Sequence, residues 1–288
     1  MTCRRIAVLW HERDRGRDLQ RYAITHLADH WRNDGHVVQF LFGVSRFEAA
    51  DVVIVHVDLT IVPARYLDFA ARYPIALNGQ VQDIRRTSYS RNLVHPEDGY
   101  TGRVIVKSNN NYAGRPDRSR AGFVAGLWWR VRRRMAALGP LRAGAPPLFD
   151  TPLDYRIFER AGDVPPAWYQ CSDLVVERFL PEREGEAYVV RNYQFLGDRW
   201  TCTRMIAAQP IVNAATHVAI EPIEPDPAIE RFRRELRFDY GKFDYVMHEG
   251  RAVLLDANKT TGAGGMQRTP ELDARRRHRA EGLYSYFS

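Results

Sequence analysis

The sequence has few cysteines and no long apolar segment. Its 288 residues include only three cysteines, Cys3, Cys171 and Cys202, and these lack the spacing of a disulfide framework or a zinc site. No apolar run approaches the roughly 18 residues that a membrane-spanning helix requires. The apolar stretch near the N-terminus is shorter than that of a signal peptide, and charged residues follow it at once. These features predict a reduced, cytoplasmic protein.

Two familiar kinds of motif are also missing. The first 100 residues contain no Gly-x-Gly-x-x-Gly sequence, so we expect no dinucleotide site there. The chain shows no Ser/His/Asp or Cys/His arrangement that would supply a nucleophilic side chain. The sequence therefore offers no motif for nucleophilic catalysis by a side chain.

The composition is ordinary for a soluble globular protein, but the charge is unevenly distributed. Hydrophobic residues make up 45% of the chain and charged residues 27%. The net charge is +7, and the segment from Arg115 to Arg142, with eight arginines and the single acid Asp117, carries +7 by itself. A basic chain can bind nucleic acid, a membrane surface or anionic substrates. The clustering assigns that property to one segment and not to the fold.

This basic segment contains a predicted amphipathic helix within an insertion over residues 118–147. At about 100° per residue, seven apolar residues of 122–138 fall on one face. They are Phe123, Val124, Leu127, Trp128, Val131, Met135 and Leu138. Such a helix could contact a membrane surface, a protein partner or an acidic substrate, or it could pack its apolar face on the protein's own body. No specific nucleic acid is expected.

Apolar runs and helical patterns alternate over the first 100 residues. The runs at 6–10, 37–42, 51–57 and 75–77 are predicted to be strands. Strands that alternate with helices predict a parallel, doubly wound α/β sheet, whose ligands lie beyond the carboxyl ends of the strands. Charged residues of the loops there could hold an acidic substrate or form a solvated rim: His11, Glu12, Arg13, Arg17 and Arg85.

Three oxygen-bearing side chains flank a predicted β-hairpin later in the chain. Asp244 precedes one short strand-like run, and Asp256 and Asn258 follow the next run. The start of one strand and the end of the next lie side by side in a hairpin, so the three side chains can converge. Two carboxylates and an amide oxygen suit Mg²⁺. A plain hairpin with acidic ends is the alternative, and the nearby Lys242 and Lys259 could contact phosphate or solvent.

The spacing of these residues resembles the metal-binding signature of the ATP-grasp ligases. Asp256 follows Asp244 by twelve positions, Asn258 comes two positions later, and a glycine-containing loop follows. Other elements occur upstream in the order typical of that family: a strand that ends at Lys107, a hydrophobic strand that leads into an acidic loop, and two strands that bear arginines. The resemblance covers about residues 101–265 and implies an ATP-grasp fold behind an N-terminal α/β domain.

The resemblance also implies a nucleotide-binding role for particular residues. The adenine base would be lined by Glu177, Arg178, Phe179 and Leu180. Lys107 would neutralise the α- and β-phosphates of ATP beside a polar loop that covers them. Glu184 or Glu186 would hold the ribose hydroxyls. Arg191 and Arg204 would contact phosphate or the developing oxyanion, which the fixed donor fork of arginine suits.

The chemistry implied by the resemblance is activation of a carboxylate. ATP would phosphorylate the carboxylate to an acyl-phosphate, and an amine or similar nucleophile, on a small molecule or a peptide, would displace the phosphate. The expected cofactors are ATP and Mg²⁺. A second lysine that is usual in the family upstream of Lys107 is missing, and Arg85, Arg86 or Arg91 could replace it.

The implied domains are an N-terminal domain over 1–100 and an ATP-grasp domain over 101–288. The latter would comprise a nucleotide clamp over 101–206, with the basic insertion, and a metal-binding subdomain over 207–288. Two other classes of protein remain open. One is an ATP-binding phosphotransferase or nucleotide sensor on the same scaffold. The other is a membrane- or nucleic-acid-binding module built on the basic helix, for which strong salt-sensitive binding without nucleotide would speak.

Overall fold

The computed structural model describes residues 2–122, 144–212, 216–263 and 269–287, together with residues 127, 129, 131 and 134. The predicted amphipathic helix over 122–138 therefore lies mostly outside the described residues. Two members of its apolar face are described, Leu127 and Val131, and each is about half exposed. Within the described ranges, no helix is both long enough and apolar enough to cross a bilayer.

The chain divides into two compact units. The first comprises Met1–Asp58, Val62–Gln82 and Pro181–Ser288, and the second comprises Leu59–Ile61 and Asp83–Leu180. The units therefore change at residues 83 and 181, whereas the sequence predicted a domain boundary at residue 100. Most of the predicted N-terminal domain shares a unit with the last third of the chain.

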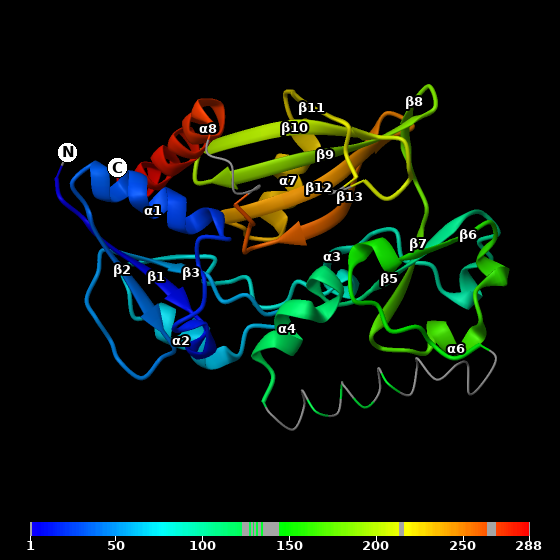
Figure 1. Cartoon of the computed structure of the whole chain (residues 1–288), viewed down its shortest axis with the longest axis horizontal. Helices are drawn as coiled ribbons and strands as arrows, with labels where there is room; N and C mark the ends of the chain where they lie inside the picture. Colours follow the sequence, from blue (N-terminus) through cyan, green and yellow to red (C-terminus); the bar gives the residue numbers. More distant parts are fainter. Residues whose placement is uncertain are drawn as a thin grey trace. The chain divides into compact units, whose positions relative to one another are not determined.

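The first unit begins with a four-stranded parallel sheet in the order β2-β1-β3-β4 (Figure 1). Its strands are β1 (Arg5–Trp10), β2 (Val37–Phe42), β3 (Val52–Val55) and β4 (Ile75–Leu77). A short 3-10 segment (Glu12–Asp14) and α1 (Ala23–Asn33) follow β1, and α2 (Ala64–Ala70) follows β3. The strands β1 and β3 are continuous apolar runs that are buried over almost their whole length, as strands covered on both faces must be. The predicted parallel α/β architecture is confirmed.

The second sheet of this unit is antiparallel, in the order β11-β10-β9-β12-β13, and β8 also pairs with β9. Its strands are β8 (Glu182–Glu184), β9 (Ala187–Leu196), β10 (Arg199–Ala207), β11 (Ala219–Pro222), β12 (Tyr240–His248) and β13 (Arg251–Asn258). Two helices, α7 (Pro227–Glu235) and α8 (Pro270–Glu281), and a 3-10 segment (Gly282–Tyr286) complete the unit. Both helices begin with proline after a capping side chain, Asp226 or Thr269, as helix starts favour.

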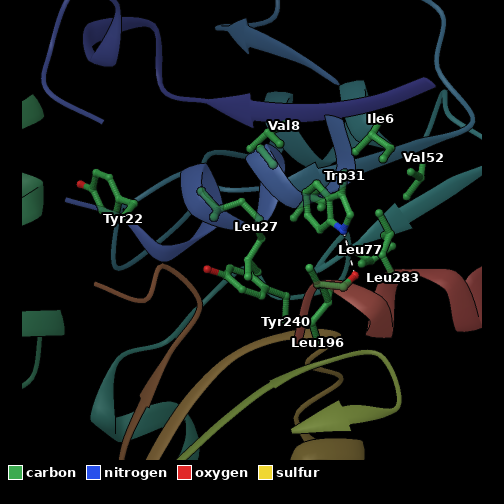
Figure 2. Packing of buried hydrophobic residues seen from close by; sticks show 14 of the residues in the cluster. Ile6, Val8, Tyr22, Leu27, Trp31, Val52, Leu77, Leu196, Tyr240 and Leu283 are labelled. Atoms are coloured by element: carbon green, nitrogen blue, oxygen red, sulfur yellow. Dashed lines mark hydrogen bonds between the residues drawn. The ribbon is translucent and has the colours of Figure 1, made fainter. Parts of the chain in front are cut away.

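One apolar core joins the two sheets of the first unit (Figure 2). Its members include Val8, Trp31, Leu196, Tyr240 and Leu283. The indole Nε1 of Trp31 donates to the carbonyl of Ala280 at 2.8 Å, which ties α1 to the end of α8. Gly282 lies so close to the backbone of Leu196 that a Cβ there would overlap the Leu196 carbonyl. These contacts fix α8 against β9.

The second unit is built on a three-stranded antiparallel sheet in the order β6-β5-β7. The strands are β5 (Val104–Ser108), β6 (Arg156–Phe158) and β7 (Leu174–Arg178). Its short helices are α3 (Arg86–Tyr89), α4 (Arg115–Arg120) and α6 (Pro166–Tyr169), with 3-10 segments at Pro96–Asp98, Asn111–Gly114, Pro152–Asp154 and Ala161–Asp163. The central strand β5 is buried throughout, including the polar residues at its carboxyl end.

Candidate functional site

The three predicted metal ligands lie together on one face of the antiparallel sheet. Asp244 on β12 is directly opposite Asp256 on β13, and Lys242 is directly opposite Asn258. Opposite residues on neighbouring strands, and residues two apart on one strand, point to the same face. The four side chains therefore form one group, which we call the acidic group. The sequence predicted that these ligands lie just outside the two strands. In the structure they lie within the strands, and the register of the pairing brings them together.

Lys242 sets the charge balance of the acidic group. Its Nζ donates to Asp244 Oδ2 at 2.7 Å, and Asn192 Nδ2 on β9 donates to Asp244 Oδ1 at 2.6 Å. Burial alone would lower the pKa of Lys242, but the carboxylates of Asp244 and Asp256 raise it above its ordinary value. The lysine is therefore cationic at neutral pH, while two carboxylates surround it.

Asn258 is oriented by the loop that follows β13. Its Oδ1 accepts hydrogen bonds from the backbone N–H of Thr260 at 2.8 Å and from the Thr260 hydroxyl at 3.1 Å. The same hydroxyl lies 2.7 Å from Asp58 Oδ1, and Tyr22 donates to the other Asp58 oxygen at 2.6 Å. Because Asp58 and Thr260 are buried, these bonds hold the end of β13 in a fixed position. Lys259, between Asn258 and Thr260, is fully buried.

The donor set of the acidic group fits a hard divalent cation. Two carboxylates and an amide oxygen are ligands that Mg²⁺ accepts while it keeps other positions for water and phosphate. Two aspartates directly opposite each other repel, and a cation between them would offset this repulsion. Within the described ranges no group of three or more His, Cys, Asp or Glu residues could hold a metal, so a site here needs the Asn258 amide as its third ligand.

The structure does not bring the two predicted catalytic arginines to the acidic group. Arg191 on β9 and Arg204 on β10 are directly opposite each other. Asn192, the next residue on β9, points to Asp244. Because neighbouring residues on a strand alternate between faces, Arg191 and Arg204 point to the opposite face.

Both arginines are bound by glutamates on that opposite face. Arg191 Nη2 lies 2.7 Å from Glu182 Oε1, and its hydrogen bonds to Glu182 raise the pKa of Arg191. Arg204 contacts Glu184 at 2.8 Å and Glu221 at 2.5 Å. These pairs link β8, β9, β10 and β11.

The two predicted ribose ligands are exposed and lie in the β8 hairpin. Glu184 pairs with Arg204 as described, and Glu186 lies 3.3 Å from Arg183. The side chain of Glu186 is fully exposed. Neither carboxylate is fixed by burial, so their contact with ribose stays a prediction.

In the second unit, Lys107 and Glu177 form a buried ion pair on adjacent strands. Lys107 Nζ lies 2.7 Å from Glu177 Oε2, and the two residues are 7% and 2% exposed. Arg86, which is 5% exposed, adds a second cation. Burial alone would raise the pKa of Glu177, but the positive charges of Lys107 and Arg86 lower it below its ordinary value. Of the three arginines that could replace the missing lysine, the structure therefore places Arg86 beside the Lys107 pair.

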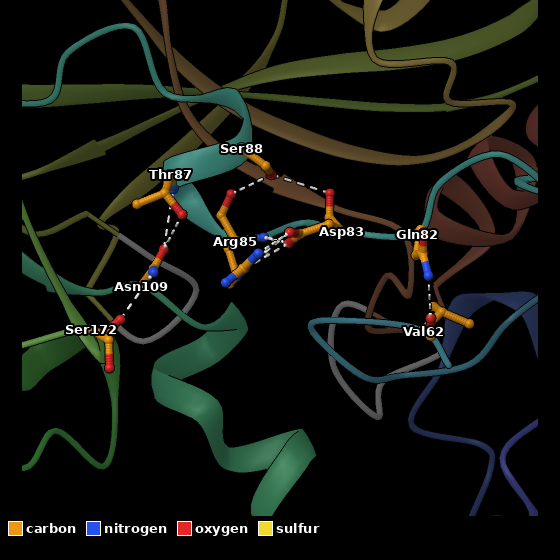
Figure 3. A network of polar contacts seen from close by, with 8 residues as sticks. All are labelled: Val62, Gln82, Asp83, Arg85, Thr87, Ser88, Asn109 and Ser172. Carbon is orange, nitrogen blue, oxygen red and sulfur yellow. Dashed lines mark hydrogen bonds and ion pairs between the residues drawn. The ribbon is translucent and has the colours of Figure 1, made fainter. Parts of the chain in front are cut away.

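Asn109 is hydrogen-bonded to Thr87, the residue after Arg86, and to Ser172 (Figure 3). The backbone N–H of Arg86 donates to the Asn109 carbonyl at 3.0 Å. The Asn109 side chain accepts from the backbone N–H of Thr87 at 3.1 Å and donates to the Ser172 carbonyl at 3.1 Å. Asn109 thus links α3, the end of β5 and the segment before β7. This part of the predicted phosphate-covering loop anchors neighbouring segments.

The predicted adenine-binding segment begins on β7 and leaves the sheet. Glu177 is occupied by its ion pair, whereas Arg178 is exposed. The backbone N–H of Phe179 donates to the Arg103 carbonyl at 2.9 Å, and the Arg103 guanidinium lies over the Phe179 ring at 4.9 Å. Leu180 is half-buried. Contact of these residues with a base stays a prediction.

One member of the acidic group, Lys242, carried a weak signal in the sequence. The alternation of Lys242 and Asp244 along one strand was available, since residues two apart share a face. Asn192 carried no such signal. Its contact with Asp244 depends on β9 pairing with β12, and such long-range pairing is invisible in a single sequence.

No protein-family model and no curated protein matches the chain. Several solved structures resemble it over nearly its whole length. A RimK domain protein of the ATP-grasp class from Sphaerobacter thermophilus DSM 20745 is 14% identical, with a TM-score of 0.46, and the match covers 98% of each chain. The D-alanine–D-alanine ligase from Bacillus anthracis, complexed with ATP, is 10% identical over 99% of this chain and 96% of that one, with a TM-score of 0.45.

A third structure is the macrocyclase MdnC bound with precursor peptide MdnA, from Microcystis aeruginosa MRC. It is 10% identical over 99% of this chain and 100% of that one, with a TM-score of 0.46. The first of the three structures belongs to the ATP-grasp class that the sequence resembles. With so few residues shared, the chemistry of this chain has to be sought in its own side chains.

Proposed function

We propose that this protein is an ATP- and Mg²⁺-dependent ligase that joins a carboxylate to an amine through an acyl-phosphate. The observation that carries this proposal is the acidic group, in which Asp244, Asp256, Asn258 and Lys242 share one sheet face by direct register. Its ligand types suit Mg²⁺, and its lysine suits a phosphoryl group.

Each residue of the acidic group has a distinct role in this proposal. Asp244, Asp256 and Asn258 would hold Mg²⁺, which when bound neutralises and orients the phosphates of ATP. Lys242, kept cationic by the two aspartates, offsets negative charge on the transferring phosphoryl group. Asn192 orients Asp244 by its 2.6 Å hydrogen bond. Contact of Lys107 with the phosphates of ATP stays a prediction, because its ammonium group is paired with Glu177.

The reaction consists of two substitutions. A carboxylate oxygen of the acid forms a bond to the γ-phosphorus of ATP, the bond from that phosphorus to the β,γ-bridging oxygen breaks, and ADP leaves. The amine nitrogen then forms a bond to the acyl carbon, the bond from that carbon to the phosphate-bearing oxygen breaks, and inorganic phosphate leaves. The amine proton passes to solvent. The products are ADP, phosphate and a C–N bond.

The substrates of this proposal are a carboxylic acid and an amine, either small molecules or groups on a peptide. The cytoplasm, which holds ATP, is the setting we propose. The three cysteines are free thiols in the structure, which suits a reducing compartment.

A screen for coupled ADP release tests the proposed function. Carboxylic acids and amines are offered in pairs with ATP and Mg²⁺, and ADP, phosphate and the joined product are measured. The ligase predicts release of ADP that requires both the acid and the amine, with product equal to ADP. Acid-dependent ADP release that ignores the amine would instead support a phosphotransferase on the same scaffold.

A further inference from the structure

Arg279 on α8 is a buried cation without a carboxylate partner among the described residues. It is 5% exposed, its Nη1 donates to the amide oxygen of Gln194, and its buried Nε has no hydrogen-bond partner in the described ranges. The charged groups that act on it are Tyr240 and two further arginines, Arg276 and Arg275. Burial lowers the pKa of Arg279 to about 10. An uncompensated guanidinium is costly to bury, which favours an anion beside it.

No acid among the described residues pairs with Arg279. The internal segments outside the described residues, 123–143, 213–215 and 264–268, contain no Asp or Glu in their sequence. Arg277, two residues before Arg279 on the same helix, shows the contrast. It pairs with Asp34 at 2.6 Å and with Glu281 at 3.2 Å. Arg277 is therefore paired with acids, whereas Arg279 has no acid partner among the described residues.

Hydrogen bonds connect Arg279 to the acidic group along one sheet face. Gln194, which accepts from Arg279, donates to Asn192 Oδ1 at 2.8 Å, and Asn192 donates to Asp244. Gln194 on β9 is also directly opposite Lys242 on β12. Arg279 therefore points to the face that carries the proposed metal ligands.

The position of Arg279 is fixed by its surroundings. Ala280 accepts the hydrogen bond from Trp31 that ties α8 to α1. Arg276, one turn earlier and 2% exposed, donates through Nη2 to the Ala263 carbonyl at 2.6 Å. The guanidinium of Arg279, held in this position, presents a planar donor fork that matches a carboxylate.

We propose that Arg279, with Arg276 beside it, binds a carboxylate of the substrate that is not phosphorylated. The inference rests on the proposed ligase function, and it narrows the substrates to a dicarboxylic acid or to an amino acid that reacts through its amine. The anion is held on the same sheet face as the acidic group, so that one molecule can present its binding carboxylate to Arg279 and its reacting group toward Lys242.

Thermal unfolding without ATP or Mg²⁺ tests this subsite independently of ligase activity. The melting temperature is measured with succinate, with glycine and with inorganic phosphate at up to 10 mM, against chloride at equal ionic strength, for the wild type, Arg279→Gln, Arg279→Lys and the matched control Arg277→Gln. These concentrations lie far below those at which salts stabilise proteins in general. A ligand at about ten times its Kd should raise the melting temperature by about 3–5 °C.

The expected result is a rise with succinate or glycine in the wild type and in Arg277→Gln. The rise should be absent in Arg279→Gln and smaller in Arg279→Lys, which keeps the charge without the fork. If neither succinate nor glycine raises the melting temperature of the wild type, the proposal is wrong, whatever the variants show. A rise of equal size in Arg279→Gln also overturns it, as does a rise with phosphate alone, which would assign the arginines to a phosphate. Loss of Mg²⁺-dependent ATP binding is measured separately, so failure of the ligase function is distinguishable from failure of the subsite.

Discussion

Both faces of the antiparallel sheet carry charged residues, but the two faces use them differently. On one face, Asp244 and Asp256 are directly opposite each other, with Lys242 between carboxylates. On the other face, Arg191 and Arg204 each meet a glutamate of the neighbouring strands. The first arrangement places like charges together, which costs stability, and the second places opposite charges together.

This difference separates a candidate reacting surface from a structural one. An arginine bound by the protein's own glutamates has little capacity left for a substrate phosphate. A pair of aspartates that repel each other gains from a bound cation. The sequence motif alone did not distinguish these cases, because alternation along β9 and β10 decides which face each arginine occupies.

The largest expected effect comes from exchanging Lys242 for methionine. Removal of the cation beside the transferring phosphoryl group should lower kcat/KM for ADP release by about 100-fold or more. The matched change on the opposite face, Arg204→Met, should alter kcat/KM by less than about 3-fold, because Arg204 is bound to Glu184 and Glu221. Equal losses in the two variants would remove the functional distinction between the faces.

Glu177→Gln tests whether the buried ion pair of the second unit, like the arginine–glutamate pairs, stabilises the fold. The change leaves Lys107 and Arg86 without their shared carboxylate and should lower the free energy of unfolding at neutral pH by about 3 kcal/mol. Since the pKa of Glu177 is lowered in the folded state, its contribution is present above the ordinary value of 4.5 and is lost as pH falls below it. Urea unfolding from pH 7 to pH 3 should therefore show the difference between wild type and variant shrinking below about pH 4.5. A difference that stays constant over this range would contradict the ion pair.

Arg191→Met is expected to act on stability. The variant loses the three hydrogen bonds from Nε and Nη2 to Glu182, whose carboxylate also accepts from the Met247 backbone at 2.7 Å. The free energy of unfolding should fall by about 1–2 kcal/mol, while the Kd for ATP with Mg²⁺ stays within about 2-fold of the wild type. Urea unfolding and calorimetric titration measure the two quantities. A large loss of ATP affinity with unchanged stability would instead support the contact with phosphate that the sequence predicted for Arg191.

The sequence predicted local elements better than long-range pairing. The runs that became β1, β3 and β4 were found because continuous apolar segments mark buried strands. The three candidate metal ligands could be predicted to converge because their spacing lies within one hairpin, and the strand register does place them together. The partners of Arg191, the role of Asn192 and the division of the chain at residue 181 depend on which distant strands pair, and one sequence holds no signal for that.

The charge environment was the second thing the sequence could not supply. Lys107 was expected to end a strand and lies one residue before the end of β5, but its burial against Glu177 depends on β5 pairing with β7. Arg86 was one of three arginines that could replace the missing lysine, and its place beside Glu177 depends on hydrogen bonds through Asn109. The burial of Lys107 and the position of Arg86 both follow from packing, which local sequence patterns do not determine.

Calorimetric titration of ATP, with and without Mg²⁺, tests the central claim most directly. The wild type, Asp256→Asn and the control Asp198→Asn, an exposed aspartate in the turn between β9 and β10 of the same sheet, are compared. Mg²⁺ should tighten ATP binding by the wild type and the control by about 10-fold or more, and Asp256→Asn should lose this Mg²⁺-dependent gain while it still binds ATP weakly. If Asp256→Asn keeps the full Mg²⁺-dependent gain, the acidic group does not hold the metal and the proposed function loses its foundation.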